Sequence, residues 1–592
     1  MICLILLNGV IRLFLKTEKV EYRNIHGLCN SLDCGKFRNV FICFHKSDVA
    51  CRCSAVFCKF FLADVLFASD SLYVFYDYLF KVHYINFDSF FIIKLLLKLI
   101  VLLYTKIDSI IFYQFEGIMS FFSLTFLVFF LIFVILYHIA ANLKNNALCI
   151  QNVLLLLAGF IFYAFADLRF VPFLLYSIVI TYFAGRFCST KFSFIIFLIA
   201  DLAPLLALKY CPLLFNMHWI FPLGISFFTF QSISYIADRY TKKIAVPANL
   251  FDTALFISFF PVISSGPIQR AGNLVPQFQN VRKFDYDNAT DGMKLFAWGM
   301  FKKICIADKI AVYVNYVYGN ASDKFGLAVL LATLLYSFQI YCDFSGYSDM
   351  AIGIAKYLGF DVGKNFDHPY LSKSVGEFWR RWHISLSSWL RDYVYIPLGG
   401  SRVKVNRIYF NLMITFLVSG LWHGSTWNFV IWGLLHGFFQ CAGRAAKPVL
   451  EKLKIPSFIK IAFTFALVTF AWIFFRAENL EQAGIVLSKI SQVPKNVCDF
   501  FAMKGQLGMK ESLRNLFALD DNIFGGFLGM IKLLSILCIL IVCELNTQRL
   551  DGITLVKSKK IFIRWILYIL LVYILIIFID FSSNTEFLYF AF

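Results

Sequence analysis

Charged side chains are scarce in this chain of 592 residues. Only 15% of the residues are Asp, Glu, Lys or Arg, while 60% are hydrophobic. A soluble domain usually carries about 25% charged residues. The shortage excludes a soluble globular protein and indicates a multi-pass membrane protein.

The sequence also lacks the common nucleotide and metal motifs. It contains no glycine-rich phosphate loop, no dinucleotide fingerprint and no HExxH zinc helix, so no metal site is predicted. The net charge of +19 falls largely in short loops such as 402–407 and 557–560. Basic loops of this kind are typical of the cytoplasmic side of a membrane protein, so a nucleic-acid partner is not expected.

Apolar stretches recur along most of the chain and predict an all-α membrane protein. About 20 apolar residues suffice to cross a bilayer, and several of the stretches are shorter, so some are expected to be re-entrant. The predicted spans are 121–141, 147–166, 170–184, 192–210, 219–236, 250–263, 292–316, 327–341, 408–422, 427–443, 459–475, 531–545 and 561–580.

The first 118 residues form a separate, poorly patterned extension. They hold seven of the 16 cysteines, at spacings that match no common zinc pattern. One interpretation is an extra domain with a metal or redox role. The interpretation we favour is that translation begins at Met119, which opens the apolar run MSFFSLTFLVFFLIFVILYHI, and that 1–118 is upstream sequence read in frame. The rest, 119–592, is predicted to be one membrane domain with a polar excursion at 476–522, whose first part suits a helix along the membrane surface.

Two segments carry the chemistry. FWRRWHISLSSWLRDYVYIPLGG (378–400) and SGLWHGSTWNFVIWGLLHG (419–437) place His383 and His423 among tryptophans. A histidine in an apolar setting has lost the water that stabilises its cation, so it tends to be neutral and able to accept a proton. A general base needs that property.

The segment 375–396 differs from the spans. Its apolar residues recur at steps of three and four and predict a helix in the interface or dipping into a protein-lined cavity. Its arginines could fix phosphates of a lipid or of coenzyme A. Alternatively, they pair with Glu377, Asp392 or lipid headgroups.

Eight motifs in order resemble the membrane-bound O-acyltransferase (MBOAT) family, and in particular its bacterial branch with the alginate O-acetyltransferase membrane subunit. The resemblance covers 119–592 and none of 1–118. The motifs are PLGISFFTFQSISYIADRY, FPVISSGPIQR, YCDFSGYSDMAIGIAKYLGF, NFDHPYL, FWRRWHISLSSWLRDYVYIPLGG, LVSGLWHGSTWNFVIWGLLHG, FAWIFFRAENLEQA and FLYFAF.

The resemblance implies acyl transfer inside the membrane, in a multi-helix fold with re-entrant and interfacial helices around a transmembrane tunnel. The signature histidine of the WHG motif matches His423, and the second polar position matches His383. A hydroxyl is too weakly acidic to attack a thioester unaided, and a neutral imidazole can take its proton. We expect His423 to be the base, with His383 orienting the donor, stabilising charge or sharing proton transfer.

Other residues are expected to play lesser parts. An acid inside a membrane is a functional candidate because burying its charge is costly, but Asp343 and Asp349 could equally be structural. His436 lies 13 positions after His423, about 220° around one straight helix, so we expect it to be a packing residue. The expected donor-binding or substrate-binding residues are Trp382, Arg380, Arg381, Arg391, Trp422, Asp343 and Ser345.

Substrates and partners follow from the resemblance alone. It implies acetyl-CoA as donor, no bound cofactor, the bacterial inner membrane as location, and a separate exported partner that completes transfer to an alginate-like or other cell-envelope polysaccharide. Peptidoglycan O-acetylation and teichoic-acid D-alanylation remain alternatives, and IPLGGSR at 396–402 favours acetylation over D-alanylation. A transporter with a relay of histidines and acids is the alternative of a different class, although the paired repeats usual in transporters are not found.

Overall fold

The computed structural model describes residues 119–143, 146–215, 221–521, 525–547 and 556–578. Every regular element in these ranges is a helix, and no strand occurs among them. The N-terminal extension with its cysteine cluster and the terminal FLYFAF motif lie outside the described residues. The predicted all-α class is confirmed.

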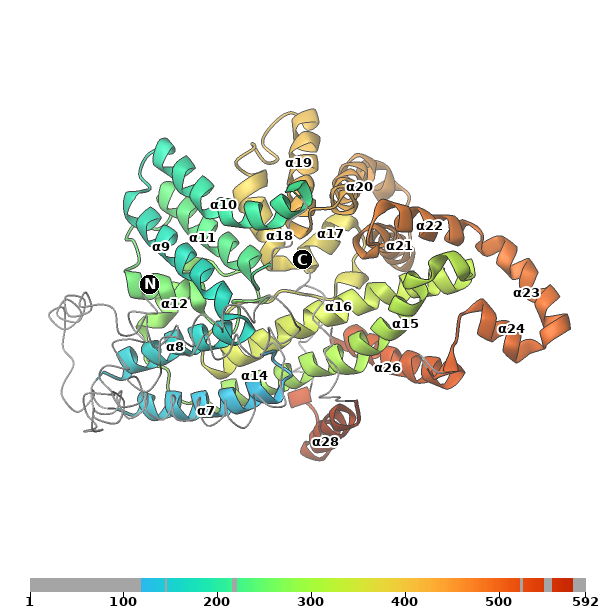
Figure 1. Cartoon of the computed structure of the whole chain (residues 1–592), viewed down its shortest axis with the longest axis horizontal. Coiled ribbons are helices and arrows are strands. Elements are labelled where there is room, and N and C mark those ends of the chain that lie inside the picture. Colours follow the sequence, from blue (N-terminus) through green and yellow to red (C-terminus); the bar gives the residue numbers. More distant parts are fainter. Residues whose placement is uncertain (1–118, 144–145, 216–220, 522–524, 548–555, 579–592) are drawn as a thin grey trace, which may run out of the picture. The chain divides into compact units, whose positions relative to one another are not determined.

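Eight described helices are long and apolar enough to cross a membrane. This confirms a multi-pass membrane protein, and Figure 1 shows the arrangement of these helices. They are α7 (Leu124–Ala141), α8 (Ala147–Ala166), α9 (Val171–Phe187) with the turn before it, α10 (Lys191–Phe215), α16 (Gly326–Tyr357), α21 (Ser457–Arg476), α26 (Gly526–Thr547) and α28 (Ile561–Phe578).

The other predicted spans are also helical, but they are shorter or more polar. They include α11 (Ile225–Tyr240), α12 (Leu250–Ser258), α19 (Val405–His423) and α20 (Trp427–Lys452). The predicted span 292–316 is not one element. It consists of α14 (Tyr286–Met300), the π-helix η4 (Phe301–Ala307) and α15 (Asp308–Gly319).

The predicted span 327–341 stops too early, because α16 is 32 residues long and continues to Tyr357. Two acids in the second half of α16 are paired with lysines of η4. Lys303 Nζ lies 2.7 Å from the Asp343 carboxylate. Lys302 Nζ lies 2.6 Å from Asp349. The pairing lets the polar half of α16 remain helical inside the protein.

Helices α14 and α16 approach closely through two pairs of glycines. A Cβ added at Gly299 would lie 2.5 Å from the carbonyl oxygen of Gly346, and one at Gly353 would lie 2.5 Å from that of Gly292. Small residues let helix backbones pack this closely in membrane proteins. We call this contact the glycine seam.

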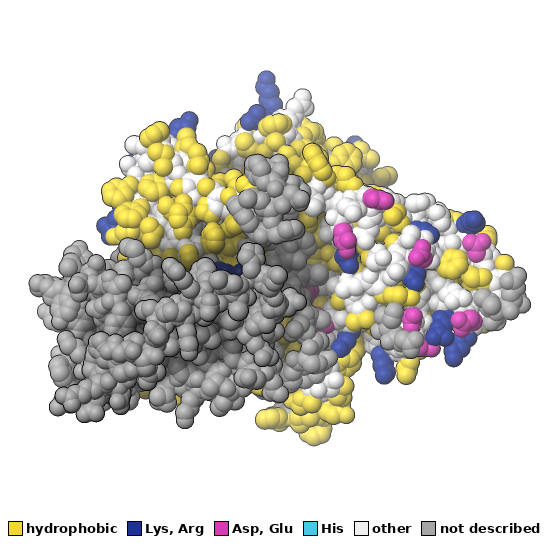
Figure 2. Space-filling view, viewed as in Figure 1, with side chains coloured by type: hydrophobic (Ala, Val, Ile, Leu, Met, Phe, Trp, Pro, Cys, Tyr) yellow, Lys and Arg dark blue, Asp and Glu magenta, His cyan; other side chains and the backbone are white. Residues whose placement is uncertain are grey.

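The polar excursion forms three helices, α22 (Leu480–Ser491), α23 (Val493–Leu507) and α24 (Met509–Leu516). In α22 the side chains of Ala483 and Val486 are buried, and the helix packs against α16 and α21. Acidic and basic side chains alternate at the right-hand end of Figure 2, where these helices lie. Hydrophobic side chains gather at its upper left, where α9 and α10 lie. The helical part of the prediction is confirmed, and its place along the membrane surface stays a prediction.

Candidate active site

The expected single helix over 375–396 is wrong, because the chain breaks at the first histidine. Helix α17 (Val375–Arg381) ends before Trp382, and α18 (Ile384–Leu390) and the π-helix η7 (Arg391–Tyr395) follow. Between them His383 has φ 44° and ψ 55°, the left-handed conformation. Holding a residue other than glycine in the left-handed conformation costs about 1–3 kcal/mol, and strain of this kind is concentrated at functional sites. Helical spacing alone cannot reveal one left-handed residue.

The connection between α16 and the short helix η6 (Pro369–Leu371) holds this break in place. The Ile384 amide donates to the Asn365 carbonyl at 2.8 Å, and the Asp367 amide donates to the Arg381 carbonyl at 2.8 Å. The side-chain oxygen of Asn365 lies 3.3 Å from His383 Nδ1. Asn365 opens the NFDHPYL motif, but no role was predicted for it from the sequence.

The second histidine also lies at a break. His423 is the last residue of α19, and α20 begins at Trp427. The two helices are in close contact, since a Cβ at Gly420 would collide with the carbonyl of Phe429, and one at Gly424 with the Phe429 ring. The WHG motif therefore ends a helix where there is no room for a side chain after the histidine.

Both histidines are buried, with exposed fractions of 0% for His383 and 2% for His423. Their rings contact the same indole: Trp422 has its ring centre 6.1 Å from that of His383 and 4.8 Å from that of His423. Phe344 packs edge-on against His383 at 4.6 Å, and Phe475 against His423 at 5.3 Å. Burial lowers the pKa of His383 to about 3, so the ring is neutral at physiological pH. The structure therefore brings together the two residues expected to carry the reaction.

A third histidine belongs to the same aromatic cluster. Trp432 has its ring centre 4.9 Å from both His423 and His436, and Trp379 Nε1 donates to His436 Nδ1 at 3.1 Å. The assumption of one straight helix through His423 and His436 is wrong, because the chain breaks between α19 and α20. The role of His436 as a packing residue stays a prediction.

A lysine near the second histidine was not anticipated. Lys209 of α10 donates to the backbone carbonyl of Trp422, and the neighbouring Tyr210 hydroxyl donates to the Leu421 carbonyl at 2.7 Å. These carbonyls belong to the last turn of α19, where helical partners run out. The two side chains hold the end of α19 that carries His423. An isolated lysine late in an apolar span gives no signal of such a contact.

The expected donor-binding arginines have local partners. Arg381 pairs with Glu377 at 2.7 Å, and Arg391 pairs with Asp392 at 2.8 Å. These are the two acids named in the alternative interpretation, in which the arginines form ion pairs and do not bind phosphate. Arg380 is exposed. Their part in donor binding stays a prediction.

Of the remaining expected binding residues, Trp382 precedes His383, and Asp343 and Ser345 flank Phe344, whose ring packs against His383. Trp382 is buried and packs on Trp472 at 5.2 Å between ring centres. On α16, Asp343 pairs with Lys303, and Ser345 Oγ accepts from Lys302 Nζ at 2.9 Å. Within the described ranges no group of three or more potential metal ligands lies together. Among the seven expected binding residues, Trp422 is the one whose ring lies beside both histidines.

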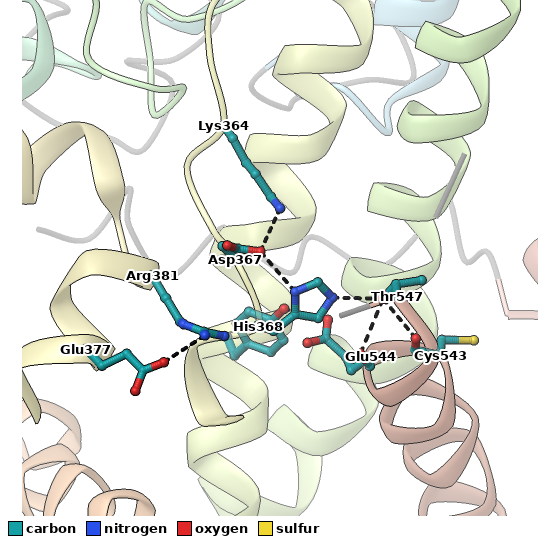
Figure 3. A network of polar contacts seen from close by, with 9 residues as sticks. Lys364, Asp367, His368, Glu377, Arg381, Cys543, Glu544 and Thr547 are labelled. Atoms are coloured by element: carbon teal, nitrogen blue, oxygen red, sulfur yellow. Dashed lines mark hydrogen bonds and ion pairs between the residues drawn. The ribbon is translucent and has the colours of Figure 1, made fainter. Parts of the chain in front are cut away.

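A polar chain next to the break connects it to a distant helix (Figure 3). Lys364 Nζ lies 2.7 Å from Asp367, Asp367 lies 3.0 Å from His368 Nδ1, and His368 Nε2 lies 2.8 Å from the Thr547 hydroxyl of α26. The connection between α16 and η6, which hydrogen-bonds to the chain around His383, is therefore also hydrogen-bonded to α26.

Comparison with known proteins agrees with this geometry. A model of the membrane-bound O-acyltransferase family matches residues 110–481. The chain belongs to the MBOAT family. It is therefore a membrane-embedded O-acyltransferase, and the predicted resemblance, fold class and enzyme class are confirmed.

Three relatives illustrate the range of this similarity. The peptidoglycan O-acetyltransferase of Helicobacter pylori is 34% identical over 498 residues, covering 74% of this chain and 91% of that protein. The Pseudomonas aeruginosa protein named "Probable alginate O-acetylase AlgI" is 40% identical over 357 residues, 56% of this chain and 68% of that protein. The teichoic acid D-alanyltransferase of Bacillus subtilis is 30% identical over 304 residues, 47% of this chain and 76% of that protein.

Proposed function

We propose that this MBOAT protein O-acetylates a glycan of the bacterial cell envelope from within the inner membrane. Acetyl-CoA on the cytoplasmic side is the donor, and a separate exported protein completes transfer to the glycan. The observation that supports acyl transfer most directly is the pair of buried histidines, His383 and His423, in contact with one indole ring.

The proposed chemistry uses these rings as proton acceptors. The acceptor hydroxyl attacks the thioester carbonyl and forms the new C–O bond, while an imidazole nitrogen takes the hydroxyl proton. The C–S bond then breaks, and the leaving sulfur takes up that proton and departs as the thiol. His423 is the proposed base, and His383 orients the donor or shares the proton. The aromatic rings around both histidines, such as Phe344 and Phe475, limit the access of water that would hydrolyse the donor.

Peptidoglycan is the first candidate for the acceptor glycan. The Helicobacter pylori relative that carries this activity in its name is matched over 91% of its length, whereas the Pseudomonas aeruginosa protein is matched over 68%. An alginate-like exopolysaccharide is the second candidate. D-Alanylation is less favoured, because the Bacillus subtilis relative matches 47% of this chain, against 74% for the Helicobacter pylori relative and 56% for the Pseudomonas aeruginosa relative.

The test is base-labile acetate measured separately in peptidoglycan and in extracellular polysaccharide. Cells carry the natural protein, His423→Ala, or the control His138→Ala at matched abundance; His138 lies in α7 beside Phe284 and Tyr357. We expect His423→Ala to lose acetate from peptidoglycan and His138→Ala to keep it. Loss from the exopolysaccharide alone would change the acceptor, and no loss from either fraction would contradict glycan acetylation through His423.

A further inference from the structure

The side chain of Asn365 makes a dense set of hydrogen bonds at the left-handed histidine. Asn365 is fully buried, with 0% exposure. One of its terminal atoms lies 3.2 Å from the Ser385 backbone nitrogen, 2.9 Å from Ser385 Oγ and 3.3 Å from His383 Nδ1. The other lies 3.1 Å from the hydroxyl of Ser348, itself fully buried on α16.

Chemistry determines which terminal atom is which. A backbone N–H can only donate, so the atom facing the Ser385 amide must be the amide oxygen. The NH₂ group then points to the Ser348 hydroxyl, which can accept. Asn365 therefore cannot turn its amide over without placing two donors against each other.

A fixed amide oxygen constrains the ring that faces it. A neutral imidazole carries its proton on one nitrogen and a lone pair on the other. The Asn365 oxygen can only accept, so its contact with His383 Nδ1 at 3.3 Å is a hydrogen bond when that nitrogen carries the proton. Ser385 Oγ lies 3.5 Å from the same nitrogen, but its hydroxyl donates to the Asn365 oxygen at the shorter distance of 2.9 Å. The other nitrogen, Nε2, then holds the lone pair.

We propose that Asn365 is a positioning residue that fixes the tautomer of His383, with the proton on Nδ1 and the lone pair on Nε2. Nε2 is then the atom that can take the hydroxyl proton or orient the reacting group. The link from this tautomer to acyl transfer rests on the proposed function. The tautomer assignment itself rests only on the hydrogen bonds of Asn365.

The same residue holds the backbone that aims the ring. The Asn365 carbonyl accepts from the Ile384 amide at 2.8 Å, directly after the left-handed residue. Backbone and side chain of one asparagine thus fix both the position and the protonated nitrogen of His383. The hydrogen bond made by one ring nitrogen of a functional histidine sets the role of the other nitrogen, so loss of the hydrogen-bond partner commonly lowers activity.

The first test reads the tautomer directly. Full-length protein labelled with ¹⁵N-histidine is placed in lipid nanodiscs, and the His383 signals are identified by their loss in His383→Gln. We expect protonated Nδ1 in the natural protein and in Asn365→Asp, whose carboxylate keeps the acceptor. Asn365→Leu has nearly the same shape but no acceptor, and we expect it to lose that preference.

The second test follows acetate release at matched abundance. We expect Asn365→Leu to lower it about 10–100-fold and Asn365→Asp to retain most of it. The control is Asn152→Leu, a buried asparagine whose side chain donates to the Phe278 carbonyl at 2.8 Å in another part of the protein. It should change neither the tautomer nor the acetate.

Three outcomes would overturn the proposal: a natural protein with protonated Nε2, an Asn365→Leu variant that keeps protonated Nδ1, or an Asn365→Asp variant as inactive as Asn365→Leu. If Asn365→Leu does not accumulate, the spectra of the natural protein and Asn365→Asp decide. The spectra also remain decisive if the acetylation assays contradict the proposed function, so the two failures are distinguishable.

Discussion

Lys303 Nζ lies 2.7 Å from the Asp343 carboxylate, and both side chains are almost fully buried. Lys303 also lies 2.9 Å from Asp308, which is less buried. One lysine of the π-helix η4 therefore forms ion pairs with an acid of α16 and an acid of α15. Removing one partner of a buried pair leaves a charge without compensation, which commonly costs about 3–5 kcal/mol.

The first prediction concerns this arrangement. Lys303→Met leaves two acids without their common cation and should destabilise the protein by about 3–5 kcal/mol. Asp343→Asn should cost less, because Asp308 still faces the lysine. Thermal unfolding in detergent measures both. The exposed pair Lys364 and Asp367 is the comparison, and Lys364→Met should cost no more than about 1 kcal/mol. Equal effects of Lys303→Met and Lys364→Met would contradict the prediction.

The second prediction tests the contact between α19 and α20. In Gly420→Ala the new Cβ meets the carbonyl of Phe429, so the helices must separate and His423, three residues later, must move. We expect a loss of about 1–3 kcal/mol together with lower acetate transfer. The matched change is Gly443→Ala in α20, where a Cβ meets nothing within 4 Å. It should be neutral or stabilise by about 0.5–1 kcal/mol.

The third prediction concerns the contact of α10 with the end of α19. Lys209→Met removes the donor to the Trp422 carbonyl and leaves a buried acceptor unsatisfied, which costs about 1–3 kcal/mol. Acetate transfer should fall because the residue next to this carbonyl is His423. Tyr210→Phe removes a more exposed bond to Leu421 and should have a smaller effect. Unchanged stability and transfer in Lys209→Met would show that the contact does not hold His423.

The sequence predicted the helical class, most spans and the two histidine segments, because these depend on local composition and spacing. It could not predict the break at His383, since one left-handed residue is fixed by contacts with Asn365, 18 positions away in sequence. Nor could it predict that Lys209 reaches Trp422, 213 positions away. Such contacts arise from packing between helices, which a periodic pattern does not specify.

The fourth prediction is a pH dependence at the polar chain in Figure 3. Partial burial acts to raise the pKa of Asp367, but hydrogen bonds from Lys364 and His368 outweigh it and hold the pKa below its ordinary value. A lowered carboxyl pKa stabilises the fold above the unfolded value of about 4, and that stability is lost as the pH falls through the folded pKa. Asp367 is nearly half exposed, so the effect should not exceed about 1 kcal/mol.

Unfolding temperatures measured from pH 6 down to pH 3 test this expectation. The natural protein should lose stability more steeply below pH 4 than Asp367→Asn, which has no carboxyl to protonate. Parallel curves for the two proteins would show that Asp367 contributes nothing through its charge.

The glycine seam determines register as well as distance. Gly292 faces Gly353, and Gly299 faces Gly346, so the two contacts recur seven residues apart along both helices. A slide of α14 along α16 by one turn, about 5.4 Å, would take each glycine off its partner and bring side chains such as Phe296 against the opposing backbone. The seam therefore opposes sliding and holds α14 and α16 in one register, much as the teeth of a ratchet hold two bars.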